Sequence, residues 1–192
     1  MFNADFDRKV YLFLAIALGI LSVGAAFTAY VLWPPNTWVG YEPAQPIAFS
    51  HKLHAGELKV DCQYCHTNVS KGAQATVPSL KTCMNCHTQV QTKDEKGQLK
   101  PDIAKLLHHW DTQEPILWKK VYDLPDFAYF DHSRHISSGI DCIECHGDIA
   151  NMVRVKRVYP LGMKECLACH RKPSAKTGAP NQAPITCGTC HR

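Results

Sequence analysis

No cysteine of this 192-residue chain stands alone, and no lysine or arginine occurs between Lys9 and Lys52. The sequence also lacks the composition of a long disordered or collagen-like chain, since 20% of its residues are charged, 45% are hydrophobic, and only 11 are glycine. Because every cysteine is paired, none is left over for thiol catalysis. The composition leaves room for one modest globular domain.

The ten cysteines form five C-x-x-C pairs, and a histidine directly follows each pair. This unit is the signature of covalent c-type haem attachment, in which both thiols form thioethers and the histidine takes the proximal position on the iron. The units are Cys62, Cys65 and His66; Cys83, Cys86 and His87; Cys142, Cys145 and His146; Cys166, Cys169 and His170; and Cys187, Cys190 and His191. The sequence therefore predicts five haem c groups.

Zinc and disulfide bonds are the alternative uses of paired cysteines. Cys65 and Cys83 enclose 17 residues, a spacing that four-cysteine zinc ribbons also use. A ribbon needs pairs of pairs, however, and gives no reason for a histidine after each pair. Five C-x-x-C disulfides would close loops too small to constrain the unfolded chain. Both alternatives are therefore disfavoured.

A run of 24 residues without charge, residues 10–33, indicates a membrane span. As a helix it is about 36 Å long, against a hydrocarbon core of roughly 30 Å. It exceeds the usual apolar core of a cleaved signal peptide, so we expect a retained signal anchor. Arg8 and Lys9 precede the run, which places the N-terminus in the cytoplasm and the rest of the chain on the periplasmic or extracytoplasmic side of the cell membrane. Trp33 and Trp38 stand where interfacial aromatic residues belong.

An internal repeat supplies further iron ligands. The segment FSHKLHAGELKVDCQYCH aligns with FDHSRHISSGIDCIECH, and each begins with F-x-H-x-x-H. This element resembles that of small multihaem cytochromes, in which the two histidines serve as distal ligands to different haems. The resemblance makes His51, His54, His132 and His135 the predicted distal ligands.

Five irons have ten axial positions, and the nine histidines named so far leave one position open. The candidates are His108, His109, Met152 and Met163. In PDIAKLLHHW the two histidines point away from the apolar face formed by Ile103, Leu106, Leu107 and Trp110, which weakens them as ligands. Methionine is favoured, without a choice between Met152 and Met163, and a sulfur ligand would raise the potential of its haem. Either methionine could instead fill space between haems.

The fold expected is a multihaem cytochrome c, with short α-helices and loops wrapped around five haems, almost no sheet, and one N-terminal transmembrane helix. About 32 residues per haem outside the membrane give side chains little core to build, so the macrocycles must supply much of it. The predicted parts are a cytoplasmic N-terminus (1–9), the anchor (10–33), a two-haem module (34–90), a linker (91–129) and a three-haem module (130–192).

The formal charge of +4 does not indicate a nucleic-acid partner, because the propionates and iron cores of five haems would change it to about −1. Basic residues gather near the C-terminus: Arg154, Lys156, Arg157, Lys164, Arg171, Lys172, Lys176 and Arg192. Neutralisation of propionates is the favoured interpretation, and docking of an acidic partner is the alternative.

Taken together, the five C-x-x-C-H units, the segment PILWKKVYDLPDFAYFDHSRH, and CHGDIANM followed by GMKECLACHR resemble the pentahaem c-type cytochrome subunit of alternative complex III. The resemblance implies a respiratory or photosynthetic membrane complex with an iron-sulfur protein, polytopic quinol-interacting subunits and other c-type cytochromes. This chain would relay electrons from quinol oxidation to a terminal oxidase, a soluble cytochrome c or a copper protein, without substrate chemistry of its own.

A second interpretation is a membrane-anchored multihaem quinol dehydrogenase, which would oxidise quinol itself. It requires a proton acceptor beside the anchor, and Glu42 is the only acidic residue between the apolar run and Glu57. Haem reduction by quinol in the isolated subunit separates the two interpretations.

Overall fold

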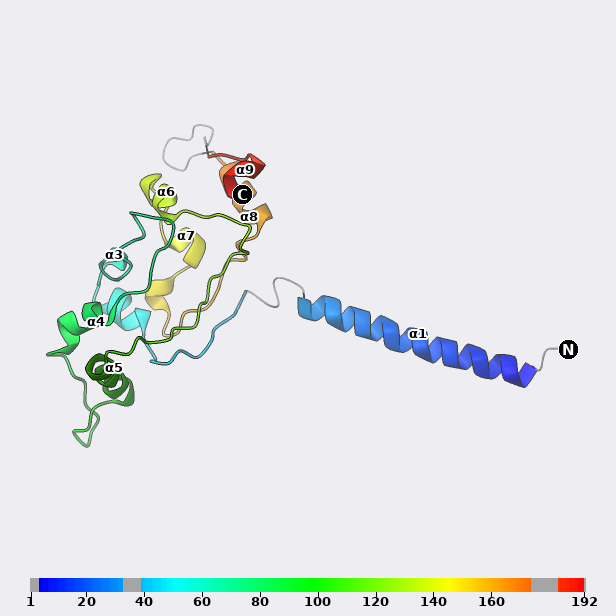
Figure 1. Cartoon of the computed structure of the whole chain (residues 1–192), viewed down its shortest axis with the longest axis horizontal. Helices are drawn as coiled ribbons and strands as arrows, with labels where there is room; N and C mark the ends of the chain where they lie inside the picture. The colour runs from blue at the N-terminus through cyan, green and yellow to red at the C-terminus, as the bar shows by residue number, and fades with distance from the viewer. Residues whose placement is uncertain (1–3, 33–38, 174–182, 192) are drawn as a thin grey trace. The chain divides into compact units, whose positions relative to one another are not determined.

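The computed structural model describes residues 4–32, 39–173 and 183–191. Its contacts divide the chain into two units, Met1–Gly40 and Tyr41–Arg192. The first unit holds one long helix, α1 (Ala4–Leu32), whereas short helices and loops make up the second (Figure 1). The second unit contains residues 41–90 of the predicted two-haem module and the whole range of the predicted three-haem module.

Helix α1 is long and apolar enough to cross a membrane, a property that signal sequences near an N-terminus share. It begins six residues before the apolar run, because Asp5 pairs with Arg8 and Lys9 one turn later, each at 3.0 Å. None of its described residues is buried. Trp33 and Trp38, the predicted interfacial residues, lie outside the described part of the chain.

The helices of the second unit are short. They are η1 (Lys52–Glu57), α3 (Cys62–Cys65), α4 (Leu80–His87), α5 (Pro101–Thr112), α6 (His132–Ser137), α7 (Ile143–His146), η2 (Ile149–Asn151), α8 (Met163–His170) and α9 (Cys187–Cys190). Within the described ranges, paired β-structure is limited to one bridge between Lys93 and Leu99. The prediction of short helices with almost no sheet is confirmed.

Aspartates start three of these helices. Asp61 accepts a hydrogen bond from the Gln63 amide at 2.7 Å and Asp131 accepts one from the Ser133 amide at 2.9 Å, so each caps free N–H groups of the first turn. Asp141, the repeat equivalent of Asp61, accepts one from the Ile143 amide at 3.2 Å. In both halves the aspartate therefore accepts from the amide two residues later, although α3 begins at Cys62 and α7 begins one position later in its motif, at Ile143.

The core made of side chains is small, as expected. Ile47, Met84 and Leu106 are its buried members, and no described side chain in the core is completely buried. Helix α5 contributes the predicted apolar face through Leu106, and the partly buried residues packed around the cluster are Leu80, Cys83, Leu107, Trp110, Ile116 and Trp118. Among the described helices, this cluster joins α5 to α4, and Ile47, Ile116 and Trp118 come from loops. The other motif helices therefore have little polypeptide core beneath them.

The two halves of the repeat hold each other in place. Helix η1 of the first half packs on η2 of the second, and the Lys52 amide donates to the Met152 carbonyl at 2.9 Å. In the other direction, the Ser133 amide donates to the Gly72 carbonyl at 3.2 Å. Each half therefore positions the segment of the other half that carries the F-x-H-x-x-H histidines.

Candidate haem-binding sites

Each C-x-x-C pair lies on or beside a short helix: α3, α4, α7, α8 or α9. All ten cysteines lie within the described ranges, and none of them forms a disulfide. In the same part of the chain, no group of three or more histidine, cysteine, aspartate or glutamate side chains converges as a metal cluster would require. The arrangement suits haem attachment, since each haem uses one isolated pair of thiols.

The histidine rings test whether an iron would fit. Two imidazoles on opposite sides of one iron have centres roughly 6 Å apart, since a metal–nitrogen bond is about 2 Å long and each ring adds ~1 Å. The structure pairs three F-x-H-x-x-H histidines with three motif histidines near that spacing. The ring centres are 6.2 Å apart for His54 and His87, 6.5 Å for His132 and His146, and 6.1 Å for His135 and His170.

Most of these rings also have the tautomer in which Nε2 can bind a metal. Where Nδ1 faces a backbone carbonyl, which can only accept, Nδ1 must carry the hydrogen, and Nε2 of the neutral ring keeps its lone pair for a metal. The Nδ1–O pairs are His54 with Ser50 (2.9 Å), His66 with Thr76 (2.7 Å), His87 with Val90 (2.8 Å), His132 with Ala73 (2.7 Å), His135 with Asp131 (2.8 Å), His170 with Pro184 (2.7 Å) and His191 with Phe127 (3.1 Å). These bonds fix both the tautomer and the ring orientation.

His51 and His146 lack such a carbonyl in the described part of the chain. Nδ1 of His51 is buried without a hydrogen-bond partner. Burial, together with the nearby rings of His66 and His54, lowers the pKa of His51 to about 4. Burial likewise lowers the pKa of His146 to about 4, with His132 and His66 adding to the effect. Both rings are therefore neutral at pH 7, as a metal ligand must be, and His51 lies close to the motif histidine His66.

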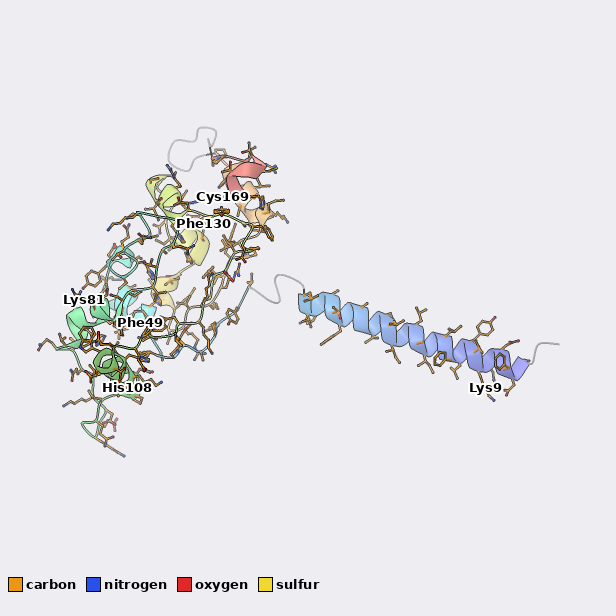
Figure 2. The ribbon with its side chains drawn as sticks, viewed as in Figure 1. Lys9, Phe49, Lys81, His108, Phe130 and Cys169 are labelled. Carbon is orange, nitrogen blue, oxygen red and sulfur yellow. The ribbon has the colours of Figure 1, made fainter. Side chains whose placement is uncertain are left out.

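A phenylalanine contacts both histidines of each F-x-H-x-x-H pair; Figure 2 labels these two residues, Phe49 and Phe130. Phe49 stacks on His54 with ring centres 4.3 Å apart and meets His51 edge-on at 4.9 Å. Phe130 repeats this geometry with His135 at 4.3 Å and His132 at 4.8 Å. In both halves the two histidines thus stand on adjacent sides of one aromatic ring, where they can face different irons.

The fifth motif has no histidine facing it in the described residues. His191 stacks on Phe127 at 5.9 Å. His108 and His109 contact each other at 6.1 Å on α5, at the opposite end of this unit from α9 (Figure 1). Met152 lies beside η1, whereas Met163 opens α8 with a side chain that is 66% exposed. The choice between the two methionines stays a prediction.

The motifs follow one another in space in an order that differs from the sequence. Burial raises the pKa of Cys83, Cys142, Cys145 and Cys166, and in each case the next cause is a thiol of another motif, respectively Cys65, Cys62, Cys169 and Cys190. The motif helices therefore neighbour one another in the order α4, α3, α7, α8, α9.

The C-terminal basic residues do not all lie on the surface. Arg154, Lys156 and Lys164 are exposed, whereas Arg157 is only 3% exposed and lies over the Tyr122 ring. Lys176 and Arg192 lie outside the described residues. The sequence analysis grouped Arg157 with the basic residues expected to neutralise propionates or to dock a partner, and it missed Tyr122, because neither residue belongs to a motif.

Removal of a distal ligand should give a spectroscopic change at one iron. In the pair His132 and His146 the ring planes are nearly parallel, at 8°, while the pairs that contain His54 and His135 are tilted by 59° and 35°. Since the ligand planes set the splitting of the iron orbitals, the parallel pair should give a rhombic low-spin ferric signal in electron paramagnetic resonance. His132→Ala should replace that signal by a high-spin one without loss of haem, because both thioethers remain.

His108→Ala is the matched control for this experiment. It removes an exposed histidine that faces only His109, so the spectrum should match that of the wild-type protein. A rhombic signal of undiminished intensity after His132→Ala would contradict the pairing of His132 with His146.

Comparisons with known proteins agree with this geometry. The class III cytochrome c family model matches residues 34–117, and the model of cytochrome c7 and related cytochromes c matches residues 128–192. The first match includes two C-x-x-C-H units and the second includes three. The multihaem cytochrome c subunit of a menaquinone reductase from Nitratidesulfovibrio vulgaris is 26% identical over 169 residues, which is 77% of either chain.

Proposed function

Because this chain is a multihaem c-type cytochrome, we propose that it is the electron-transfer subunit of a membrane complex that exchanges electrons with quinone. The observation that carries the proposal is the set of histidine pairs, each with the spacing that one iron requires. The motif helices that hold them neighbour one another in the order given above. Haem c supplies reversible one-electron transfer when bound. The chain holds, spaces and insulates the sites between which electrons pass.

The proposed roles of the side chains follow from this arrangement. The ten motif cysteines attach five haems, and the five motif histidines bind the irons on the proximal side. His51, His54, His132 and His135 bind on the distal side, opposite His66, His87, His146 and His170 in that order. Met163 is the better candidate for the fifth distal position, because α8 neighbours α9, whereas Met152 is tied to η1.

The order of the motif helices gives the proposed path of electrons. It runs from the site on α4, which the side-chain cluster around Leu106 covers, through α3 and α7 to α8 and α9. The step from α3 to α7 joins the two halves of the repeat, where Cys62 neighbours Cys142. The chain end at α9, which has no comparable cluster in the described residues, is the proposed contact with a periplasmic partner.

Helix α1 is the proposed anchor, with the N-terminus in the cytoplasm and residues 39–191 outside it. The complex would contain an iron-sulfur protein, polytopic quinol-interacting subunits and other c-type cytochromes. In the first candidate function, electrons from quinol oxidation pass through this subunit toward an oxidase, a soluble cytochrome c or a copper protein, as in alternative complex III. In the second, which the name of the relative favours, they pass in the other direction and reduce menaquinone.

The test is haem reduction in the full chain purified from membranes in mild detergent with its partners. Menaquinol should reduce all haems of the complex. A reduced periplasmic cytochrome should reduce them only if electrons can also enter from the periplasmic partner. The subunit stripped of its partners should react with dithionite but not with menaquinol. Rapid reduction of the isolated subunit by menaquinol would instead support a quinol dehydrogenase.

The mass of the purified chain is the independent check on cofactor number. Five covalent haems add roughly 3 kDa, which intact mass spectrometry resolves at once. A smaller increment, or no absorbance change with dithionite, would overturn the proposal at its first step.

A further inference from the structure

His146 differs from the other four motif histidines in what supports its ring. Among the described residues, those four each donate a ring N–H to a backbone carbonyl, and His146 does not. Tyr122 takes that place and meets the His146 ring edge-on, with centres 4.4 Å apart. The proximal side of this site is therefore closed by an aromatic ring.

Behind Tyr122 lies a buried positive charge. The Arg157 guanidinium is 5.7 Å from the centre of the Tyr122 ring, within the range of a cation–π contact. It also donates to the carbonyls of Pro160 (3.2 Å) and Tyr159 (3.4 Å), so its position is fixed. A guanidinium stays charged even when it is buried.

The loop around Arg157 is fastened to other parts of the unit. Its amide donates to the Tyr41 carbonyl at 2.9 Å, and the Val158 amide donates to the Tyr122 hydroxyl at 3.2 Å. The hydroxyl in turn donates to the Lys156 carbonyl at 3.4 Å. These hydrogen bonds fix the positions of Tyr122 and Arg157 beside His146. His146 belongs to α7, the middle helix in the spatial order of the motif helices.

We propose that Arg157 and Tyr122 are positioning residues that raise the reduction potential of the iron held by His146 and His132 above that of the other irons with two histidine ligands. This inference rests on the proposed function. Two features act in the same direction. A ring N–H bonded to a carbonyl makes the imidazole a stronger donor, which favours ferric iron, and His146 has no such bond. The nearby cation disfavours the extra positive charge of ferric iron.

The contrast with the other rings supports the assignment to this iron. His51 also lacks a carbonyl partner, but its ring packs against Phe49, which carries no charge. Both rings of the pairs His54 with His87 and His135 with His170 have carbonyl partners. The site on α7 is thus distinguished by a buried cation behind its proximal ring.

The experiment is a potentiometric titration of the purified full chain, followed by electron paramagnetic resonance. The rhombic signal expected from His132 and His146 is assigned by its absence from a Cys142→Ala/Cys145→Ala variant. In the wild-type protein this signal should be the first of the signals from irons with two histidine ligands to disappear on reduction. Arg157→Gln should change its ratio of oxidised to reduced iron about tenfold at fixed potential, a lowering of about 59 mV for one electron.

Three further variants control for charge and for packing. Arg157→Lys keeps a positive charge and should retain most of the wild-type potential, while Arg154→Gln removes an exposed charge three residues away and should change little. Arg157→Met has an unbranched side chain that fills the buried space. It should show the same lowered reduction potential, and it replaces Arg157→Gln in the test if that variant loads haem poorly.

The inference is overturned if the rhombic signal of the wild-type protein is not the first to disappear. It is equally overturned if Arg157→Gln and Arg157→Met leave its potential unchanged, or if Arg154→Gln lowers it as much. Each of these results can occur in a protein that carries five haems and accepts electrons, so the proposed function would stand without the inference.

Discussion

Cys142→Ala/Cys145→Ala is expected to lower haem content from five to four and to divide the electron path into two separate halves. The motif on α7 lies between those on α3 and α8, because Cys142 neighbours Cys62 and Cys145 neighbours Cys169. Tunnelling falls steeply with distance, so electrons that enter at one end should no longer reach the other. In the assembled complex, the fast phase of reduction by quinol should cover about half of the remaining haems.

Cys187→Ala/Cys190→Ala is the matched control. It also leaves four attachment sites, but it removes the last one in the series, so the four that remain are still neighbours. All four should be reduced in one fast phase. Intact mass should show the loss of one haem, roughly 0.6 kDa, in both variants. A full fast phase in the α7 variant would show that the order inferred from the thiols is wrong.

Gly56→Ala is expected to have the second largest effect, through packing rather than through a ligand. A Cβ atom at Gly56 would lie 2.2 Å from the carbonyl oxygen of Ala150 and 3.3 Å from its carbon. Since these are backbone atoms, no side-chain rotation can relieve the overlap, and η1 must separate from η2. We expect a loss of about 2–3 kcal/mol in the free energy of unfolding.

The displacement should also be visible at the irons, because His51 and His54 lie at the start of η1. A fraction of high-spin ferric signal should accompany the lower thermal midpoint measured by circular dichroism. Gly188→Ala is the control, because a Cβ at Gly188 would have no neighbour within 4 Å. Wild-type stability of Gly56→Ala would show that η1 does not rest on η2 in the protein with its haems bound.

The repeat was a good guide to local structure. From FSHKLH and FDHSRH alone, the sequence analysis selected the histidines whose rings the structure places near His66, His87, His146 and His170. It also identified the apolar face of α5, because Leu106, Leu107 and Trp110 recur with helical spacing and Pro101 marks its start. Such patterns arise from contacts between residues close in the sequence.

Other features had no local pattern. The sequence analysis grouped Arg157 with the other basic residues near the C-terminus, yet it is buried against Tyr122, 35 residues earlier in the chain. Gly56 belongs to no sequence motif, and its close contact with Ala150 is made by a residue far away in the sequence. The start of α1 at Ala4 was missed for a simpler reason. The charged residues mark the N-terminal boundary of the apolar run, but the helix continues through them to Ala4.

By itself, the sequence determined that this protein attaches haem, how many attachment units it has, and which histidines are suited to bind iron, because each of these depends on residue types at short, repeated spacings. The tertiary structure decided which histidine faces which, the order α4, α3, α7, α8, α9, and the buried charge behind His146. These depend on how two halves of the chain pack against each other across some 80 residues, and no short-range spacing specifies that packing.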